Sequence, residues 1–188
     1  MACQRHIGRA GLIGAVTVLI AASAAKPVLA QETLELAVKA TYLYKFAPFV
    51  DWPDGAFAST VAPFTICVVG NDPFGSLLDR AVAGQRVGAR AIVVRRVAVA
   101  FPGQPCQIMY LGGSPAQPVS RALKAMRGAP VLTVTDGSSA PGIVDFLLSD
   151  GRVQFRIDDE AAAQGGLAIS SKLLHIAVEV APRRAEHQ

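Results

Sequence analysis

The feature that most constrains the fold is the apolar run Phe64–Gly70, which reads FTICVVG. A nearly continuous apolar run of this length is typical of a strand that is covered on both faces, as in a mostly parallel sheet. Strand patterns are also expected at 91–99, 107–112 and 130–135, with a short helix at 73–83 and another at 118–127. Strands that alternate with helices predict an α/β domain with a central sheet.

The two ends of the predicted domain have different patterns. Residues 33–50 carry apolar side chains at three- and four-residue steps, which predicts an amphipathic helix that Pro48 ends or bends. The aromatic residues that follow, Phe49, Trp52 and Phe57, are expected to be buried.

Near the C-terminus, strands at 142–148 and 152–157 are separated by Ser-Asp-Gly, which indicates an antiparallel hairpin. Helices are expected at 158–164 and 169–180. The predicted fold is therefore one α/β domain, with a mixed, mostly parallel central sheet flanked by helices and a C-terminal hairpin.

The first thirty residues have the pattern of a secretory signal peptide. Arg5, His6 and Arg9 form a basic start, an apolar stretch follows, and small residues precede a predicted cleavage between Ala30 and Gln31. A membrane anchor is the alternative, but the apolar stretch is shorter than the roughly 20 residues of a spanning helix. We expect a cleaved leader at 1–30, the domain at 31–181, and a polar, frayed tail at 182–188.

The positive charge of the chain belongs largely to this leader. The whole chain has 18 Lys and Arg against 14 Asp and Glu, a net charge of +4. Cleavage would remove Arg5, Arg9 and Lys26 but no acid, leaving 15 basic and 14 acidic residues. A charge this close to neutral is no evidence for binding to nucleic acid or anionic lipid. No second apolar run of spanning length follows the leader, so membrane insertion is not expected after cleavage. The doublets 95–96 and 183–184 are expected to be solvated.

Cysteine usage agrees with export. Cys3 lies in the leader, and Cys67 and Cys106 remain, an even number for an oxidising compartment. We expect these two to form a disulfide, with two buried free thiols as the alternative. No metal site is expected, because there is no CxxC motif and only His175 and His187 remain outside the leader.

The turn after the first strand raises the question of a ligand. Asp72 before Pro73 predicts a capped helix start, in which the carboxylate accepts from free backbone N–H groups. The glycine motifs of nucleotide-binding loops are absent. A small ligand beyond the strand ends, at Asn71 and Asp72, remains an alternative, because sheets of this kind bind ligands there.

No catalytic constellation is apparent, and neither an enzyme nor a cofactor is expected. Ser170, Ser171 and Lys172 have the wrong spacing for a Ser-Lys pair, so Ser170 is interpreted as a helix cap. The acids at 158–160 are likewise explained by a helix start. A hydrolase that uses His175 as base is retained as a further alternative.

Six stretches in fixed order resemble the YfiR-like family of periplasmic proteins. They are VKATYLYKFAPFVDWP from Val38, ICVVGNDPFG from Ile66, CQIMYLGGS from Cys106, PVLTVTD from Pro130, GIVDFLLSDGRVQFRID from Gly142 and GGLAISSKLLHIA from Gly165. The resemblance implies a single periplasmic α/β domain that binds and represses an inner-membrane diguanylate cyclase and so lowers cyclic di-GMP signalling. It also implies a homodimer and places the family's disulfide at Cys67 and Cys106. A second cysteine pair found in some members is missing.

Three functions follow in order of preference. The first is the periplasmic repressor, for which Arg152 and Arg156 on the hairpin are candidate contacts with the cyclase or a related sensor. The second is a periplasmic small-ligand sensor or binding protein that feeds another membrane signalling partner. The third is the secreted hydrolase.

Overall fold

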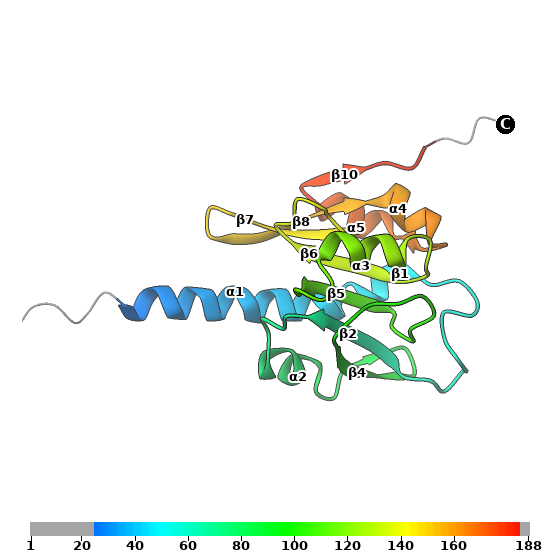
Figure 1. Ribbon diagram of the computed structural model, residues 1–188, viewed down its shortest axis with the longest axis horizontal. Coiled ribbons are helices and arrows are strands. Elements are labelled where there is room, and N and C mark those ends of the chain that lie inside the picture. The colour runs from blue at the N-terminus through cyan, green and yellow to red at the C-terminus, as the bar shows by residue number, and fades with distance from the viewer. Residues whose placement is uncertain (1–24, 185–188) are drawn as a thin grey trace, which may run out of the picture.

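The computed structural model describes residues 25–184 and has a mostly parallel sheet at its centre (Figure 1). Five neighbouring strands are parallel, in the spatial order β4-β2-β5-β6-β7. They are β2 (Phe64–Gly70), β4 (Arg90–Val97), β5 (Ile108–Gly113), β6 (Leu132–Asp136) and β7 (Val144–Ser149). The predicted α/β class with a mixed, mostly parallel sheet is confirmed.

Three further pairings extend this sheet to eight strands. β8 (Arg152–Asp158) runs antiparallel to β7, β10 (Glu179–Ala181) parallel to β8, and β3 (Arg86–Val87) antiparallel to β4. A separate two-stranded sheet joins β1 (Val50–Asp51) to β9 (Ala168–Ile169). The predicted hairpin is confirmed, and its tip has left-handed backbone at Asp150 (φ 51°) and Gly151 (φ 70°), as a tight hairpin turn requires.

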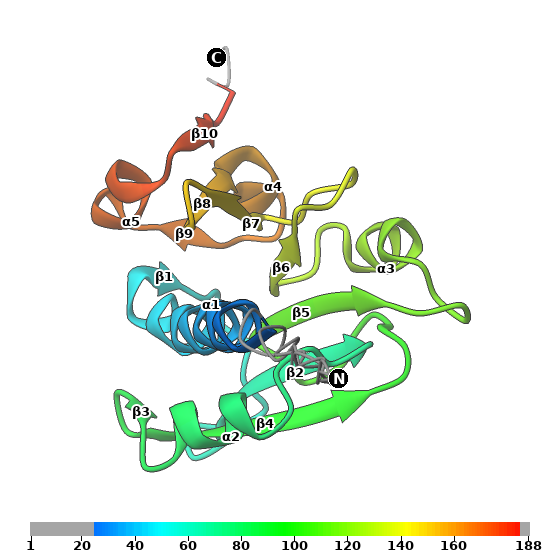
Figure 2. The same ribbon diagram turned by 90° about the vertical axis from the view of Figure 1, so that its left-hand side faces the viewer.

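Helices cover the sheet on both faces (Figure 2). α1 (Ala25–Lys45) and α2 (Ser76–Val82) pack on one face, and α3 (Val119–Met126) packs on the other. α4 (Asp159–Gln164) and α5 (Ser171–Ile176) contribute Ala162 and Leu173 to the same core as α1. A 3-10 turn (Ala47–Phe49) joins α1 to β1.

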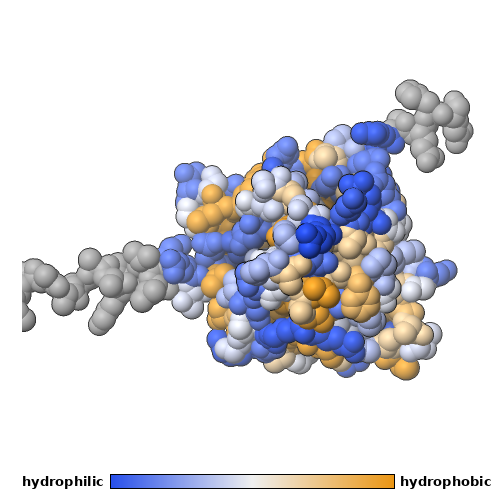
Figure 3. All heavy atoms as spheres, in the orientation of Figure 1, coloured by the Kyte–Doolittle hydropathy of each residue, from blue (hydrophilic) through white to orange (hydrophobic). Residues whose placement is uncertain are grey.

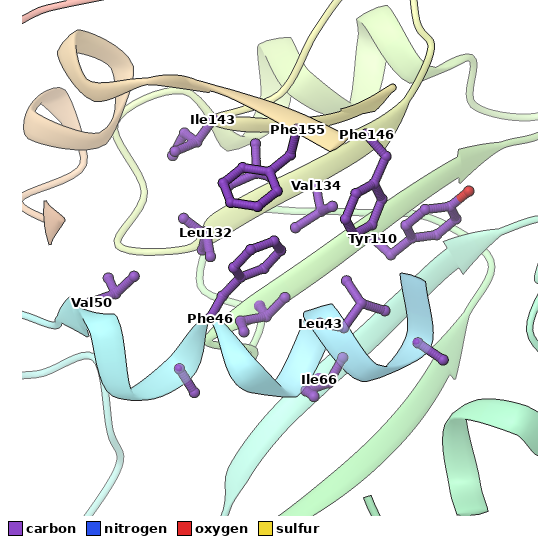
Figure 4. Close-up of a cluster of buried hydrophobic side chains, with 14 of the residues drawn as sticks. Leu43, Phe46, Val50, Ile66, Tyr110, Leu132, Val134, Ile143, Phe146 and Phe155 are labelled. Atoms are coloured by element: carbon purple, nitrogen blue, oxygen red, sulfur yellow. The ribbon is translucent and has the colours of Figure 1, made fainter. Parts of the chain in front are cut away.

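The two faces of β2 explain why its sequence is apolar throughout. Ile66 and Val68 point into the larger core under α1, whereas Cys67 and Val69 point into a smaller core under α3. Several aromatic rings meet in the larger core (Figure 4): Phe46, which directly follows α1, contacts Phe155 edge-on at 5.2 Å between ring centroids. A cysteine in mid-strand is therefore a residue of the second core.

Several predicted boundaries are wrong. The first helix ends at Lys45, not at 50, because the chain turns there to place Val50 opposite Ile169 in the small sheet. The closing helix 169–180 is also wrong: α5 stops at Ile176, and Val178 then donates to the Phe155 carbonyl at 3.0 Å as the chain joins β8. The aromatic corner at Phe49, Trp52 and Phe57 is half-buried rather than buried.

Most of the predicted leader lies outside the described residues, as do residues 185–188. The predicted cleavage between Ala30 and Gln31 falls within α1 and stays a prediction. In the part of the chain that the structure describes, no helix combines the length and the apolar character needed to cross a membrane.

Candidate functional site

The strand order places Asn71 where ligands bind in many α/β folds. The order β4-β2-β5-β6-β7 reverses between β2 and β5, and crevices at such switch points commonly hold ligands. Here the backbone closes this position. The Asn71 N–H donates to the Gly113 carbonyl at 2.9 Å, and a Cβ at Gly112 would lie only 1.9 Å from the Asn71 carbonyl oxygen.

Asp72 is occupied by contacts within the protein. One carboxylate oxygen accepts the N–H groups of Phe74 (2.8 Å) and Gly75 (3.1 Å), and the other accepts Arg96 Nε at 2.7 Å. Arg96 also pairs with Asp79 at 2.8 Å, and this hydrogen bond holds the pKa of Asp79 below its ordinary value. The ligand site predicted at Asn71 and Asp72 stays a prediction, but every contact found there is structural.

Two expectations about this turn need correction. α2 begins at Ser76 and its N-cap is Gly75, without a side-chain cap, so Pro73 is not the first helical residue and Asp72 closes a turn ahead of the helix. Arg96 is exposed, as expected, but it is not isolated, because it bridges the carboxylates of Asp72 and Asp79. Arg183 likewise pairs with Asp159 at 2.8 Å, so the predicted frayed tail is attached at least there.

A buried ion cluster joins α1 to the end of β6. Lys39 is only 3% exposed, and its Nζ lies 2.5 Å from Glu35 Oε1 and 2.6 Å from Asp136 Oδ2. Burial itself lowers the pKa of Lys39, but hydrogen bonds to Asp136 and Glu35 outweigh it and raise that pKa above the ordinary 10.5. No local pattern signals this contact, because Lys39 and Asp136 lie 97 positions apart in the chain.

A second polar cluster crosses the hairpin and involves one predicted contact residue. Asp145 of β7 is completely buried; it accepts the Thr135 hydroxyl and pairs with Arg156 at 3.0 Å. Arg156 Nε is buried and has no hydrogen-bond partner among the described residues. Arg156 is therefore held by the sheet, whereas Arg152 at the hairpin tip is exposed and remains available.

Exposed apolar side chains gather where α1 runs beside the hairpin. Leu34 and Leu148 are 58% and 54% exposed. Tyr42 contacts Phe146 at a tilt and Phe155 edge-on, with 6.1 and 5.6 Å between ring centroids. The N-terminal end of α1 and the hairpin tip lie at the same end of the molecule (Figure 1). Val38, one helical turn before Tyr42, is therefore on the side of Leu148 and Val153, which pair two residues nearer the hairpin tip. Figure 3 shows hydrophobic atoms at this end of the molecule. We call Leu34, Val38, Tyr42, Leu148 and Val153 the α1–hairpin surface.

This surface continues across α1. A shallow hollow of about 380 Å³ lies over the outer side of the helix. It is lined by Ala37, Val38, Thr41, Tyr42 and Lys45. The outward face of α1 is thus partly apolar and is not covered by the rest of the described chain.

The other residues singled out in the sequence are the two cysteines, the predicted helix caps and His175. Cys67 and Cys106 form the expected disulfide, with 5.8 Å between their Cα atoms. Ser170 caps α5 by accepting the Leu173 N–H, and Asp158 caps α4 by accepting the Ala161 N–H at 2.8 Å, as the cap interpretation predicted. His175 is exposed in the last turn of α5. Within residues 25–184, no three His, Cys, Asp or Glu side chains are grouped to hold a metal ion.

A comparison with models of protein families identifies the family of this domain. The model of the YfiR/HmsC-like family matches residues 36–178, from within α1 to the residue before β10. The chain belongs to the YfiR/HmsC-like family. Members of the YfiR/HmsC-like family are periplasmic regulators rather than enzymes. No curated protein matches the chain significantly.

Proposed function

We propose that this protein is a periplasmic regulator that binds and represses an inner-membrane diguanylate cyclase, and so lowers cyclic di-GMP signalling. The observation that carries the proposal is the family match over residues 36–178, which spans nearly all of the described α/β domain. Cleavage between Ala30 and Gln31 would release the domain into the periplasm, where the Cys67–Cys106 bridge is stable. We further propose that it acts as a homodimer.

The protein would act on the cyclase through contact alone. A repressor works by binding one state of its partner more tightly than the other. Moving that partner from a 1:99 to a 99:1 ratio of states requires about 5.5 kcal/mol of preference. A contact surface of ordinary size with a few anchoring side chains supplies free energies of this order.

The α1–hairpin surface is the proposed site of this contact. Leu34 and Leu148 are each a little over half exposed, so burying them against a partner would contribute about 1 kcal/mol each. Arg152 lies at the hairpin tip beside them, and arginine at the rim of an apolar patch is common in protein interfaces. Arg156, the other predicted contact residue, is the weaker candidate because Asp145 already binds it.

The first test is genetic. Deleting the gene should raise cyclic di-GMP and surface attachment in the native host, and the full-length chain should restore both. A chain that begins at Gln31 and stays in the cytoplasm should restore neither. If deletion leaves the nucleotide level unchanged, the regulatory function is refuted.

The second test addresses the surface. Leu34→Asp and Leu148→Asp place a charge in the α1–hairpin surface and should abolish repression at normal periplasmic protein levels. Val61→Asp makes the same chemical change at a position that is 88% exposed and outside this surface, and it should repress like the wild type. Equal repression by all three variants would place the partner contact elsewhere.

A further inference from the structure

A cavity lies between α3 and α4. Its volume is about 650 Å³, which falls within the range of small-molecule sites. The connection between β6 and β7 returns between the two helices (Figure 2), and its residues Gly142 and Ile143, with Thr133 of β6, line the cavity. The Ile143 N–H donates to the Thr133 hydroxyl at 3.0 Å, which holds this part of the wall in place.

The cavity wall combines an apolar part with a charged rim. Leu123, Met126, Pro141, Ile143 and Ala161 supply the apolar part. Lys124, Arg127 and Arg184 supply three positive charges against the two carboxylates of Asp158 and Glu160. Figure 3 shows hydrophilic atoms over α3 and α4 in the middle of this face.

The two carboxylates already have partners, whereas the cations do not. Asp158 accepts the Ala161 N–H, and Glu160 accepts the Arg184 N–H at 2.9 Å and Gln164 Nε2 at 3.2 Å. Among residues 25–184, no carboxylate pairs with the side chains of Lys124, Arg127 or Arg184. Uncharged N–H groups do not cancel the charge of the two carboxylates, so three positive and two negative side chains leave the cavity wall with a net charge of +1.

The dipole of α3 does not prevent an anion from binding beside Lys124 and Arg127. The carboxyl end of a helix carries partial negative charge, but that effect is confined to the last turn and is screened at an exposed site. Lys124 and Arg127 have flexible side chains that reach beyond the last turn, and both are exposed. An anion held by them would keep its apolar portion against Leu123 and Met126.

We propose that this cavity binds a small organic anion, with its carboxylate or phosphate group at Lys124 and Arg127 and its apolar body against α3 and the β6–β7 connection. Carboxylates and phosphate esters share the chemistry that arginine and lysine recognise. The cavity lies outside the α1–hairpin surface, so this site stands independently of the proposed function.

The test uses purified protein of residues 31–188 and three probes with the same ring. Benzoate and phenyl phosphate are anionic, and benzamide is neutral; each is titrated by calorimetry and by displacement of the fluorescent anion 8-anilinonaphthalene-1-sulfonate. At least one anion should bind and displace the dye, and benzamide should do so at least tenfold more weakly. Comparing the two anions distinguishes a carboxylate ligand from a phosphate ester. Equal binding of benzamide, or no binding of either anion, would overturn the proposal.

Variants then locate the site. Lys124→Glu combined with Arg127→Glu should weaken anion binding at least tenfold, and Arg152→Glu, the same change on the hairpin, should leave it unchanged. Ser120→Trp fills the cavity from an exposed position of α3 and should also block binding without altering the circular dichroism spectrum. If Arg152→Glu weakens binding as much as the α3 variants, the anion is held by general surface charge and the proposal fails.

Discussion

The ion cluster at Lys39 is expected to stabilise the packing of α1 on the sheet by an amount that can be measured. Replacing Lys39 with methionine keeps the length and apolar character of the side chain but removes its charge-assisted hydrogen bonds to Glu35 and Asp136. Breaking a fully buried pair costs 3–5 kcal/mol, because an unpaired charge remains. Here Glu35 and Asp136 are 20% and 29% exposed and keep some water, so we expect a loss of about 2 kcal/mol.

Urea unfolding at neutral pH measures this loss. The midpoint should fall without a change in slope, and the double variant Lys39→Met with Asp136→Asn should show a coupling of about 1 kcal/mol or more. Lys172→Met, an exposed lysine in α5, is the control and should lie within about 0.5 kcal/mol of the wild type. If Lys39→Met changes the free energy of unfolding no more than Lys172→Met does, and the coupling is near zero, the ion cluster does not stabilise the attachment of α1.

The same cluster has a defined pH dependence. The pKa of Lys39 is raised above 10.5 in the folded protein, so its contribution to stability is complete below its unfolded pKa and is lost as the pH rises through the higher folded value. The stability difference between wild type and Lys39→Met should therefore stay constant up to about pH 9 and shrink in more alkaline solution. A difference that shrinks instead between about pH 9 and pH 6 would contradict this assignment.

Three further changes test other parts of the fold. Reducing the Cys67–Cys106 bridge, or replacing both residues with alanine, should cost roughly 4 kcal/mol because the bridge closes a loop of 39 residues; an unchanged urea midpoint in reductant would contradict this. Gly112→Ala places a Cβ 1.9 Å from the Asn71 carbonyl oxygen and should cost about 2 kcal/mol or more in thermal unfolding, whereas Gly137→Asn, at an open position with φ 55°, should be nearly neutral. Arg96→Gln should lower the urea midpoint at pH 7 but much less at about pH 2, because the depressed pKa of Asp79 gives stability that is lost as the pH falls through that pKa; the same loss at both pH values would refute the Arg96–Asp79 contribution.

The parts of the fold that local patterns predict are those in which burial alone determines the order of apolar and polar residues. Phe64–Gly70 is apolar throughout because both of its faces are covered, and this pattern predicted its place in a parallel sheet. The hairpin at 144–158 alternates around Ser-Asp-Gly, and Phe146 and Phe155 face each other as that alternation requires. The Cys67–Cys106 pair followed from an even cysteine count in an exported chain.

The predictions that the structure corrects mostly concern residues whose contacts lie in distant segments of the chain. The segment 169–180 has a helical apolar pattern, yet its second half pairs with β8, because backbone hydrogen bonds at the sheet edge outweigh local preference. The sequence at Asp72 predicts a helix cap, but the carboxylate closes a turn, and the two cannot be told apart locally because both use the same hydrogen bonds to backbone N–H groups. Asp136 lies 97 positions from Lys39, and Asp159 lies 24 positions from Arg183, and no periodicity encodes such distant pairs.

The sequence does not predict the α1–hairpin surface, for a related reason. Outside the core, the residues that could meet a partner carry no pattern that distinguishes them from ordinary exposed positions. Leu34 and Leu148 stand out only when α1 and the hairpin are placed side by side, since each alone is a single exposed leucine. The motifs that resemble the family are mostly core sequence, and they specify the fold on which this surface is carried. Substitutions at Leu34 and Leu148 should therefore separate repression from stability, because neither side chain is buried in the core.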